Sequence, residues 1–333
     1  GMMGPLNNFM NNFGVSLVIG VGAVLAINGY VTIGVIAAVV TYTRQFFRPI
    51  NQLSNLLTLF QSAIAGAERV FEILDEENEN VNEHGKEKAR FDGEVTFENI
   101  QFEYVKGKPI LRGIHFTARA GEMVAIVGPT GSGKTTIIQL LTRFYDTTGG
   151  RILLDGEPIT NYKMTNVRDH VGVVLQDTYL FSGTVRENIR FGKLDATDEE
   201  VEQAAKVAYA HNFIKYLPQQ YETMLTSGGM NLSQGQRQLI AIARAILEDP
   251  DILILDEATS SVDTMTEVHI QKGLNNLMKG RTSFVIAHRL KTIENADTIL
   301  VLKDGQILES GNHDLLMKKG GFYATLQNNL ATE

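Results

Sequence analysis

The residues with the most specific chemistry run from Gly128 to Thr135 and read Gly-Pro-Thr-Gly-Ser-Gly-Lys-Thr, which fits the pattern G-x-x-x-x-G-K-[ST]. Glycines in such a loop let successive backbone N–H groups point at phosphate oxygens, helped by the positive end of the following helix. Lys134 is expected to reach the β- and γ-phosphates, and the Thr135 hydroxyl to bind Mg²⁺. A glycine-rich turn with an exposed lysine is the alternative. The predicted phosphate-binding residues are Gly128, Pro129, Thr130, Gly131, Ser132, Gly133, Lys134, Thr135 and Thr136.

A second group with chemical potential is the acidic pair Asp256 and Glu257, which ends the apolar run Ile252-Leu-Ile-Leu. A buried parallel strand would deliver both carboxylates to its C-terminal edge, beside a nucleotide. Asp256 is then expected to hold Mg²⁺ through water, and Glu257 to polarise an attacking water. A strand followed by an ordinary acidic turn is the alternative for this pair alone.

The elements that must position these groups are readable on either side of the loop. Met123-Val-Ala-Ile-Val127 has the character of a buried strand, and Thr136-Ile-Ile-Gln-Leu-Leu-Thr142 that of an apolar helix. Strand, loop and helix in this order are the context that the phosphate-loop pattern requires. An α/β fold with a parallel sheet is therefore predicted.

A third motif, from Asn231 to Ala245, is a polar turn that leads into a helix with Ser233 as its expected N-cap. By itself it indicates a capped amphipathic helix. Together with the two motifs above, it resembles the signature sequence of ABC-type ATPases. The resemblance extends over essentially the whole chain, to one half of an ABC exporter.

That resemblance implies roles for residues that composition alone does not single out. Tyr104 would stack on adenine, Gln176 would contact Mg²⁺ and the attacking water, and His288 would contact the γ-phosphate. Ser261 to Asp263 would face a partner domain, whose bound ATP would be capped by the signature residues of this chain. The implied catalytic residues are Glu257, His288 and Gln176, the metal-binding residues are Thr135, Gln176 and Asp256, and the signature contacts are Ser233, Gly235 and Gln236.

The signature departs from the family pattern Leu-Ser-Gly-Gly-Gln, because Gln234 stands where the first glycine of the pair is usual. Upstream, Ser227 stands where many exporters have a glutamate. Both departures resemble one subunit of the heterodimeric bacterial multidrug exporters, which have one degenerate nucleotide site. The expected partner is a second half-transporter subunit in a heterodimer, with a homodimer as the alternative. This chain would supply the phosphate loop of the active site.

The N-terminal region is apolar, with no Asp, Glu, Lys or Arg before Arg44. A bilayer core of about 30 Å needs roughly 20 such residues in a helix, so the segments 6–27 and 31–40 are predicted as two membrane spans. Because Arg44 and Arg48 follow the second span, both outer ends of the hairpin are expected in the cytoplasm. A signal peptide or a buried soluble hairpin is the alternative. An exporter half has six membrane helices, so the chain is expected to be the C-terminal part of a longer protein or a truncated reading frame.

The predicted organisation is a transmembrane helical hairpin with a cytoplasmic extension over residues 1–74, a polar linker over 75–90, and an ABC ATP-binding domain over 91–333. That domain is expected to combine a parallel sheet core, a small antiparallel β subdomain and a helical insert at about 197–245.

Composition narrows the class of protein further. A net charge of −8 argues against a nucleic-acid footprint, and the absence of cysteine excludes disulfides and thiol chemistry. The favoured function is ATP-driven export of a drug, lipid or peptide across the cell membrane by a multi-pass protein in contact with membrane lipid, with the ATPase domain in the cytoplasm. A soluble mechanical ABC ATPase acting on nucleic acid or ribosomes, and a regulatory module that does not hydrolyse ATP, are the alternatives.

Overall fold

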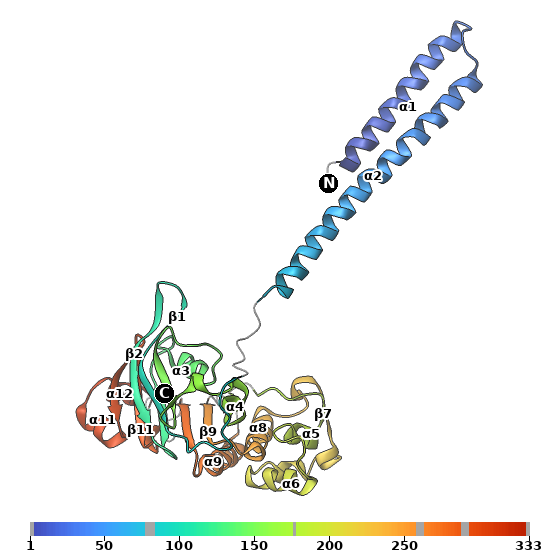
Figure 1. The fold of residues 1–333 in the computed structure, drawn as a ribbon. Coiled ribbons are helices and arrows are strands. Elements are labelled where there is room, and N and C mark those ends of the chain that lie inside the picture. Colours follow the sequence, from blue (N-terminus) through green and yellow to red (C-terminus); the bar gives the residue numbers. More distant parts are fainter. Residues whose placement is uncertain (1–2, 77–83, 176–177, 258–262, 288–292, 331–333) are drawn as a thin grey trace. The chain divides into compact units, whose positions relative to one another are not determined.

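The structure is a computed structural model that describes residues 3–76, 84–175, 178–257, 263–287 and 293–330. The chain divides into two compact units, residues 1–80 and residues 81–333 (Figure 1). Each unit has its own internal packing, and each is described separately below.

The first unit is a helical hairpin. Helix α1 (Met3–Ile27) and helix α2 (Ile33–Leu74) pack side by side and are joined by a tight turn in which Gly29 has a φ of 75°. Close packing is visible at Gly22, where a Cβ atom would lie 2.9 Å from Cγ1 of Ile36. Among the described residues, one segment, Asn8–Ile27, is long and apolar enough to cross a membrane, and the apolar start of α2, Ile33–Phe46, is shorter. The predicted span 31–40 therefore belongs to a much longer helix.

The second unit is built on two sheets. Its central sheet has the strand order β12-β11-β3-β10-β9-β6, in which β11, β3, β10, β9 and β6 are parallel and β12 is antiparallel. The other sheet, β2-β1-β4-β5, is antiparallel. The strands are β1 (Val95–Val105), β2 (Lys108–Ala118), β3 (Met123–Val127), β4 (Gly149–Leu154), β5 (Glu157–Pro158), β6 (Val171–Val174), β7 (Gly183–Thr184), β8 (Met224–Leu225), β9 (Ile252–Glu257), β10 (Thr282–Ala287), β11 (Thr298–Lys303) and β12 (Gln306–Gly311).

The helices of this unit pack on the central sheet or beside it. Helices α5, α6 and α8 contact one another and lie on the side of the unit away from α11 and α12 (Figure 1). The helices are α3 (Lys134–Leu141), α4 (Met164–Asp169), α5 (Val185–Arg190), α6 (Asp198–Val207), α7 (His211–Ile214), α8 (Gln234–Glu248), α9 (Thr264–Met278), α11 (His313–Lys319) and α12 (Phe322–Leu330), with short 3-10 turns at Ile159–Asn161, Gln220–Glu222 and Ser227–Gly229.

The apolar core lies on both faces of the central sheet, because successive side chains of a strand point to opposite sides. In β3, Val124 and Ile126 pack into one buried cluster, whereas Ala125 and Val127 pack into the other. All four side chains are at most 6% exposed. A strand that is buried on both faces reads as a continuous apolar run, as the sequence of β3 does.

A short helix, α5, also precedes the segment predicted as a helical insert at about 197–245. Helix α5 starts at Val185 behind a capping box in which Thr184 and Glu187 bond each other's backbone N–H groups. Helix α6 starts behind a second capping box, formed by Thr197 and Glu200. Each box satisfies N–H groups that a helix start leaves unpaired. The Thr-x-x-Glu spacing at Thr184 is the sequence signal for the start of α5.

Residues 84–90 of the predicted linker pack within the second unit. The backbone N–H of Lys86 donates to the Asn161 carbonyl (2.8 Å), and its ammonium pairs with Glu157 (2.7 Å). Lys88 pairs with Asp155 at 2.6 Å, and Arg90 with Asp251 at 3.1 Å. Residues 77–83 lie outside the described ranges. The chain before Phe91 is therefore already attached to the second unit.

Candidate nucleotide-binding site

The phosphate loop joins the end of β3 to the start of α3, as its pattern predicts. Its three glycines, Gly128, Gly131 and Gly133, all have positive φ, at 152°, 79° and 104°. At Gly128 the need for glycine is also steric, because a Cβ atom there would lie 2.2 Å from the carbonyl oxygen of Leu302 on the neighbouring strand β11. The loop is therefore held close against the sheet, with its backbone turned toward the N-terminus of α3.

Lys134 folds over this loop. Its ammonium donates to the carbonyl oxygens of Gly128 at 2.8 Å and Pro129 at 3.0 Å. Burial lowers the pKa of Lys134, and the nearby carboxylate of Asp256 acts in the opposite direction. A partly desolvated ammonium group beside a glycine-rich loop is suited to the negative charge of a polyphosphate.

A pocket of about 400 Å³ opens at this loop and gathers residues from several elements. Tyr104 and Ile110 come from β1 and β2 of the antiparallel sheet, whereas Asp256 and Ile286 come from the central strands β9 and β10. The strands place Asp256 directly beside Ile286 in register. The lining residues are Tyr104, Ile110, Thr130, Gly131, Gly133, Lys134, Thr135, Thr136, Asp256 and Ile286.

The structure thus brings together Tyr104, the phosphate loop and Asp256, which are far apart in the sequence. Ile110 and Ile286 are lining residues that the sequence reasoning missed. Ile286 was readable as part of an apolar strand, but its place beside Asp256 depends on the pairing of β9 with β10.

The polar atoms of the site fit a nucleotide with Mg²⁺. Ser132 is 2% exposed, and its hydroxyl oxygen has no hydrogen-bond partner among the described residues. Thr135 is exposed on the pocket wall, which leaves its hydroxyl accessible beside Asp256. Within the described ranges, no group of three or more His, Cys, Asp or Glu side chains is placed to hold a metal. Mg²⁺ is commonly held by one or two protein oxygens together with substrate phosphates and water.

The predicted catalytic residues are only partly described. Glu257 is the last residue of β9, and its backbone pairs with that of Ala287 at the end of β10. Gln176 and His288 lie outside the described residues, as do Ser261 and Val262. Asp263 caps helix α9 by accepting the N–H of Thr266 at 3.0 Å.

The signature residues form the start of helix α8. The Ser233 hydroxyl accepts the N–H of Gln236 at 3.3 Å, and the Gln236 side chain accepts the N–H of Ser233 at 3.0 Å. Gly235 is buried in the first turn. Ser233, Gly235 and Gln236 are not among the residues that line the nucleotide pocket of the same chain. Their role at the site of a partner stays a prediction.

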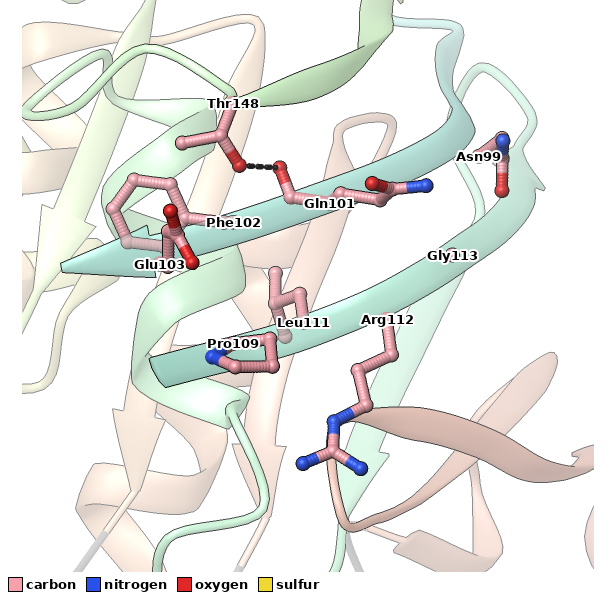
Figure 2. A pocket seen from close by; sticks show the side chains of 9 residues that line it. All are labelled: Asn99, Gln101, Phe102, Glu103, Pro109, Leu111, Arg112, Gly113 and Thr148. Carbon is pink, nitrogen blue, oxygen red and sulfur yellow. Dashed lines mark hydrogen bonds between the residues drawn. The ribbon is translucent and has the colours of Figure 1, made fainter. Parts of the chain in front are cut away.

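A second hollow, of about 460 Å³, lies along β1 and β2 and shares no lining residue with the nucleotide pocket (Figure 2). Its wall includes Gln101, Glu103 and Arg112, and Thr148 closes one side by donating to the Gln101 carbonyl at 2.9 Å. Because no phosphate-loop residue reaches it, this larger hollow is not the nucleotide site.

Comparison with known proteins agrees with this site. Residues 111–260 match the ABC transporter family. The chain is 50% identical over 327 residues to YfiC of Bacillus subtilis, an uncharacterized ABC transporter ATP-binding protein, covering 98% of this chain and 54% of that protein. It is 46% identical to a fatty acid ABC transporter ATP-binding/permease protein of Mycobacterium bovis, covering 97% of this chain and 51% of the relative.

A solved structure of a bacterial Atm1-family ABC exporter with ATP bound is also similar, with a TM-score of 0.72 and 36% identity over 100% of this chain and 58% of the other. The chain spans about half the length of the curated relatives it matches. The matched region 111–260 contains the phosphate loop, the signature helix and the strand that ends in Glu257. This chain therefore belongs to the ABC transporter family and carries that family's ATP-binding domain.

Proposed function

We propose that this chain binds and hydrolyses ATP as the C-terminal part of an ABC exporter subunit. The observation that carries this proposal is the pocket that joins Tyr104, the phosphate loop and Asp256. The tyrosine ring supplies a stacking surface for a base, while the loop supplies N–H groups and the ammonium of Lys134 for phosphates. Each part of an ATP molecule thus has a matching chemical partner in one cavity.

In the proposed reaction, Lys134 and the loop N–H groups orient the β- and γ-phosphates and stabilise the charge that develops on them. Thr135, Asp256 and Gln176 would hold Mg²⁺, which neutralises phosphate charge when it is bound. Glu257 accepts a proton from the attacking water, and His288 contacts the γ-phosphate. The position of Glu257 at the end of β9, one residue after Asp256, supports this assignment.

The pocket supplies contacts to one side of the nucleotide, and the signature helix of the same chain does not line it. We therefore infer that a second subunit completes the site with its own signature. Gln234 in the signature and Ser227 upstream support a heterodimer with two unequal sites. This chain would then supply the phosphate loop, Glu257 and His288 to the hydrolysing site and its altered signature to the weaker one.

Helix α1 supports a membrane location, because its segment Asn8–Ile27 has the length and apolar composition of a span. The exported substrate is proposed to be a lipid-like amphiphile, as the name of the fatty acid transporter relative suggests. ATP binding would close the paired domains and hydrolysis would reopen them, driving the membrane helices between two states.

The substitution Glu257→Gln tests the catalytic part of the proposal. A general base contributes about 10²- to 10⁴-fold to a rate, so ATP turnover of the assembled exporter should fall by that order while ATP binding is retained. Unchanged turnover would point to a nucleotide-binding module that does not hydrolyse ATP. Ser233→Ala in the same subunit is a useful companion, because it should affect only the site of the partner.

A further inference from the structure

The hydroxyl group of Tyr104 hydrogen-bonds to helix α3, which follows the phosphate loop. The hydroxyl oxygen lies 3.1 Å from the Thr136 hydroxyl and also hydrogen-bonds the side-chain carbonyl oxygen of Gln139. Thr136 and Gln139 stand on α3, one helical turn apart. The two contacts therefore join the tip of the antiparallel sheet to the helix that begins at Lys134.

The strand pairing of the β1–β2 hairpin is irregular near its tip. The pairing of β1 with β2 shifts register between Phe102 and Glu103 and again between Glu103 and Val105, so the ladder is irregular where Tyr104 lies. Tyr104 and Val105 are 46% and 59% exposed. The tip is also seen projecting from the rest of the sheet (Figure 1).

The opposite side of the hairpin is hollow. The cavity of about 460 Å³ runs along this side, and it is lined by Gln101 and Glu103, the alternate residues of β1 (Figure 2). Beside this hollow, the hairpin is contacted by Thr148, whose hydroxyl donates to the Gln101 carbonyl at 2.9 Å, three residues before Tyr104. The hydrogen bonds of the Tyr104 side chain itself lie on the nucleotide side, to Thr136 and Gln139 of α3.

Aromatic neighbours set the angle of the ring. Phe102 and Tyr145 meet the Tyr104 ring edge-on, with centroid distances of 4.8 Å and 5.1 Å. Edge-to-face pairs of this kind are favourable but permit sliding, whereas hydrogen bonds to the hydroxyl are directional. The hydroxyl contacts therefore add what the aromatic contacts lack, a defined distance between the ring and α3.

We propose that the Tyr104 hydroxyl and Gln139 form a latch that holds the adenine-stacking ring at the correct distance from the phosphate loop. Gln139 is thereby a positioning residue for the base of ATP, acting through Tyr104. The proposal rests on the proposed function, in which Tyr104 stacks on adenine. Loss of the latch should therefore weaken the binding of nucleotides, which have a base, and leave the binding of polyphosphate unchanged.

The test measures binding of Mg²⁺–ATP and of Mg²⁺–tripolyphosphate, which lacks the base, to the full chain by titration calorimetry. Tyr104→Phe keeps the ring and removes the hydroxyl, and Gln139→Leu removes the acceptor. A net contribution typical of one hydrogen bond corresponds to a weakening of ATP binding by about 2- to 12-fold, with tripolyphosphate binding unchanged. The double variant should lose little more than Tyr104→Phe alone, because that variant already removes the contact with Gln139 together with the one to Thr136.

Gln101→Leu is the matched control. It makes the same chemical change, but on the hairpin that carries Tyr104, at a side chain that lines the hollow and not the nucleotide pocket (Figure 2). ATP affinity should not change in this variant. An equal loss of affinity in Gln101→Leu would overturn the latch, and so would a Gln139→Leu variant that weakens ATP and tripolyphosphate alike.

A further variant, Tyr104→Ala, separates this inference from the function on which it rests. If Tyr104→Ala weakens ATP binding and Tyr104→Phe does not, the ring stacks on adenine but the latch is refuted. If neither variant changes ATP affinity, the assignment of Tyr104 to adenine fails, and the latch fails with it. A thermal unfolding midpoint measured for each variant shows that the comparison is made between folded proteins.

Discussion

The phosphate loop offers a contrast between two glycines that can be tested with the same substitution. Gly131 has a φ of 79°, yet a Cβ atom there would have no heavy atom within 4 Å. Gly128 has a φ of 152°, and its Cβ would lie 2.2 Å from the carbonyl oxygen of Leu302. Gly131→Ala therefore introduces only backbone strain, whereas Gly128→Ala adds a collision with the backbone of β11.

The expected losses of ATP affinity and of stability therefore differ between the two variants. A residue with a side chain in the left-handed region costs about 1–2 kcal/mol, which is roughly 5- to 30-fold in ATP affinity if the loop must keep this shape to bind. Because Gly131 is exposed, the loop of the variant can relax, and its stability should change little. In Gly128→Ala, overpacking of about 1–3 kcal/mol adds to the strain and cannot be relieved by a change of rotamer. Its thermal midpoint should fall by about 2–4 °C per kcal/mol.

Two measurements on the full chain decide the matter: calorimetric titration with Mg²⁺–ATP, and thermal unfolding without nucleotide. The reasoning predicts that Gly131→Ala loses affinity at nearly unchanged stability, and that Gly128→Ala loses both. It is refuted if Gly128→Ala binds ATP and unfolds like the unchanged chain. It is also refuted if Gly131→Ala is the less stable of the two variants.

Further predictions concern the ion pair of Lys88 with Asp155, the signature helix and the helical hairpin of the first unit. Asp155 accepts the N–H groups of Asp92, Gly93 and Glu94 at 2.8–3.0 Å and pairs with Lys88, so Asp155→Ala should lower the free energy of unfolding by about 2–4 kcal/mol in a denaturant titration. Burial raises the pKa of Asp155, but these hydrogen bonds outweigh it and hold the pKa below its ordinary value. Its contribution to stability is therefore present above the unfolded-state pKa of about 3.9 and is lost as the pH falls through the lower folded-state pKa, which unfolding at graded pH would show. Ser233→Ala should cost about 0.5–2 kcal/mol through the lost N-cap without changing ATP affinity at the pocket of its own chain, as titration calorimetry would reveal. Removal of residues 1–76 should abolish the need for detergent, and aggregation of the shortened chain in buffer would contradict the membrane assignment of α1.

Several features of the fold follow from local sequence alone. The apolar run of β3, the glycines of the phosphate loop and the helix that follows were predictable because strand, turn and helix preferences act within a few residues. The capping boxes at Thr197 and Ser233 are likewise local, since a side chain three residues away supplies each bond. The same Thr-x-x-Glu spacing at Thr184 also precedes a helix, α5.

Tertiary structure decided which distant residues lie together around the phosphate loop. Sequence reasoning placed Tyr104 beside a nucleotide only through a family resemblance, because a tyrosine at a strand end is ordinarily a packing residue. The pairing of β9 with β10 and the approach of the β1–β2 hairpin to α3 place Ile286, Ile110 and Tyr104 around the phosphate loop. Such pairings depend on long-range contacts, which residue types within a short window do not specify.

The sequence by itself therefore predicted phosphate binding at Gly128 to Thr136, because that chemistry resides in the backbone of one short loop. Tertiary structure decided what surrounds the loop: which carboxylate stands beside Lys134, which ring lines the pocket, and which groups of α3 hydrogen-bond the hydroxyl of that ring. It also attached residues 84–90 to the second unit through ion pairs with side chains more than 60 positions away. The physical reason is the same in each case: a loop can carry its own hydrogen-bond donors, but a pocket needs walls from strands that meet only when the sheet has formed.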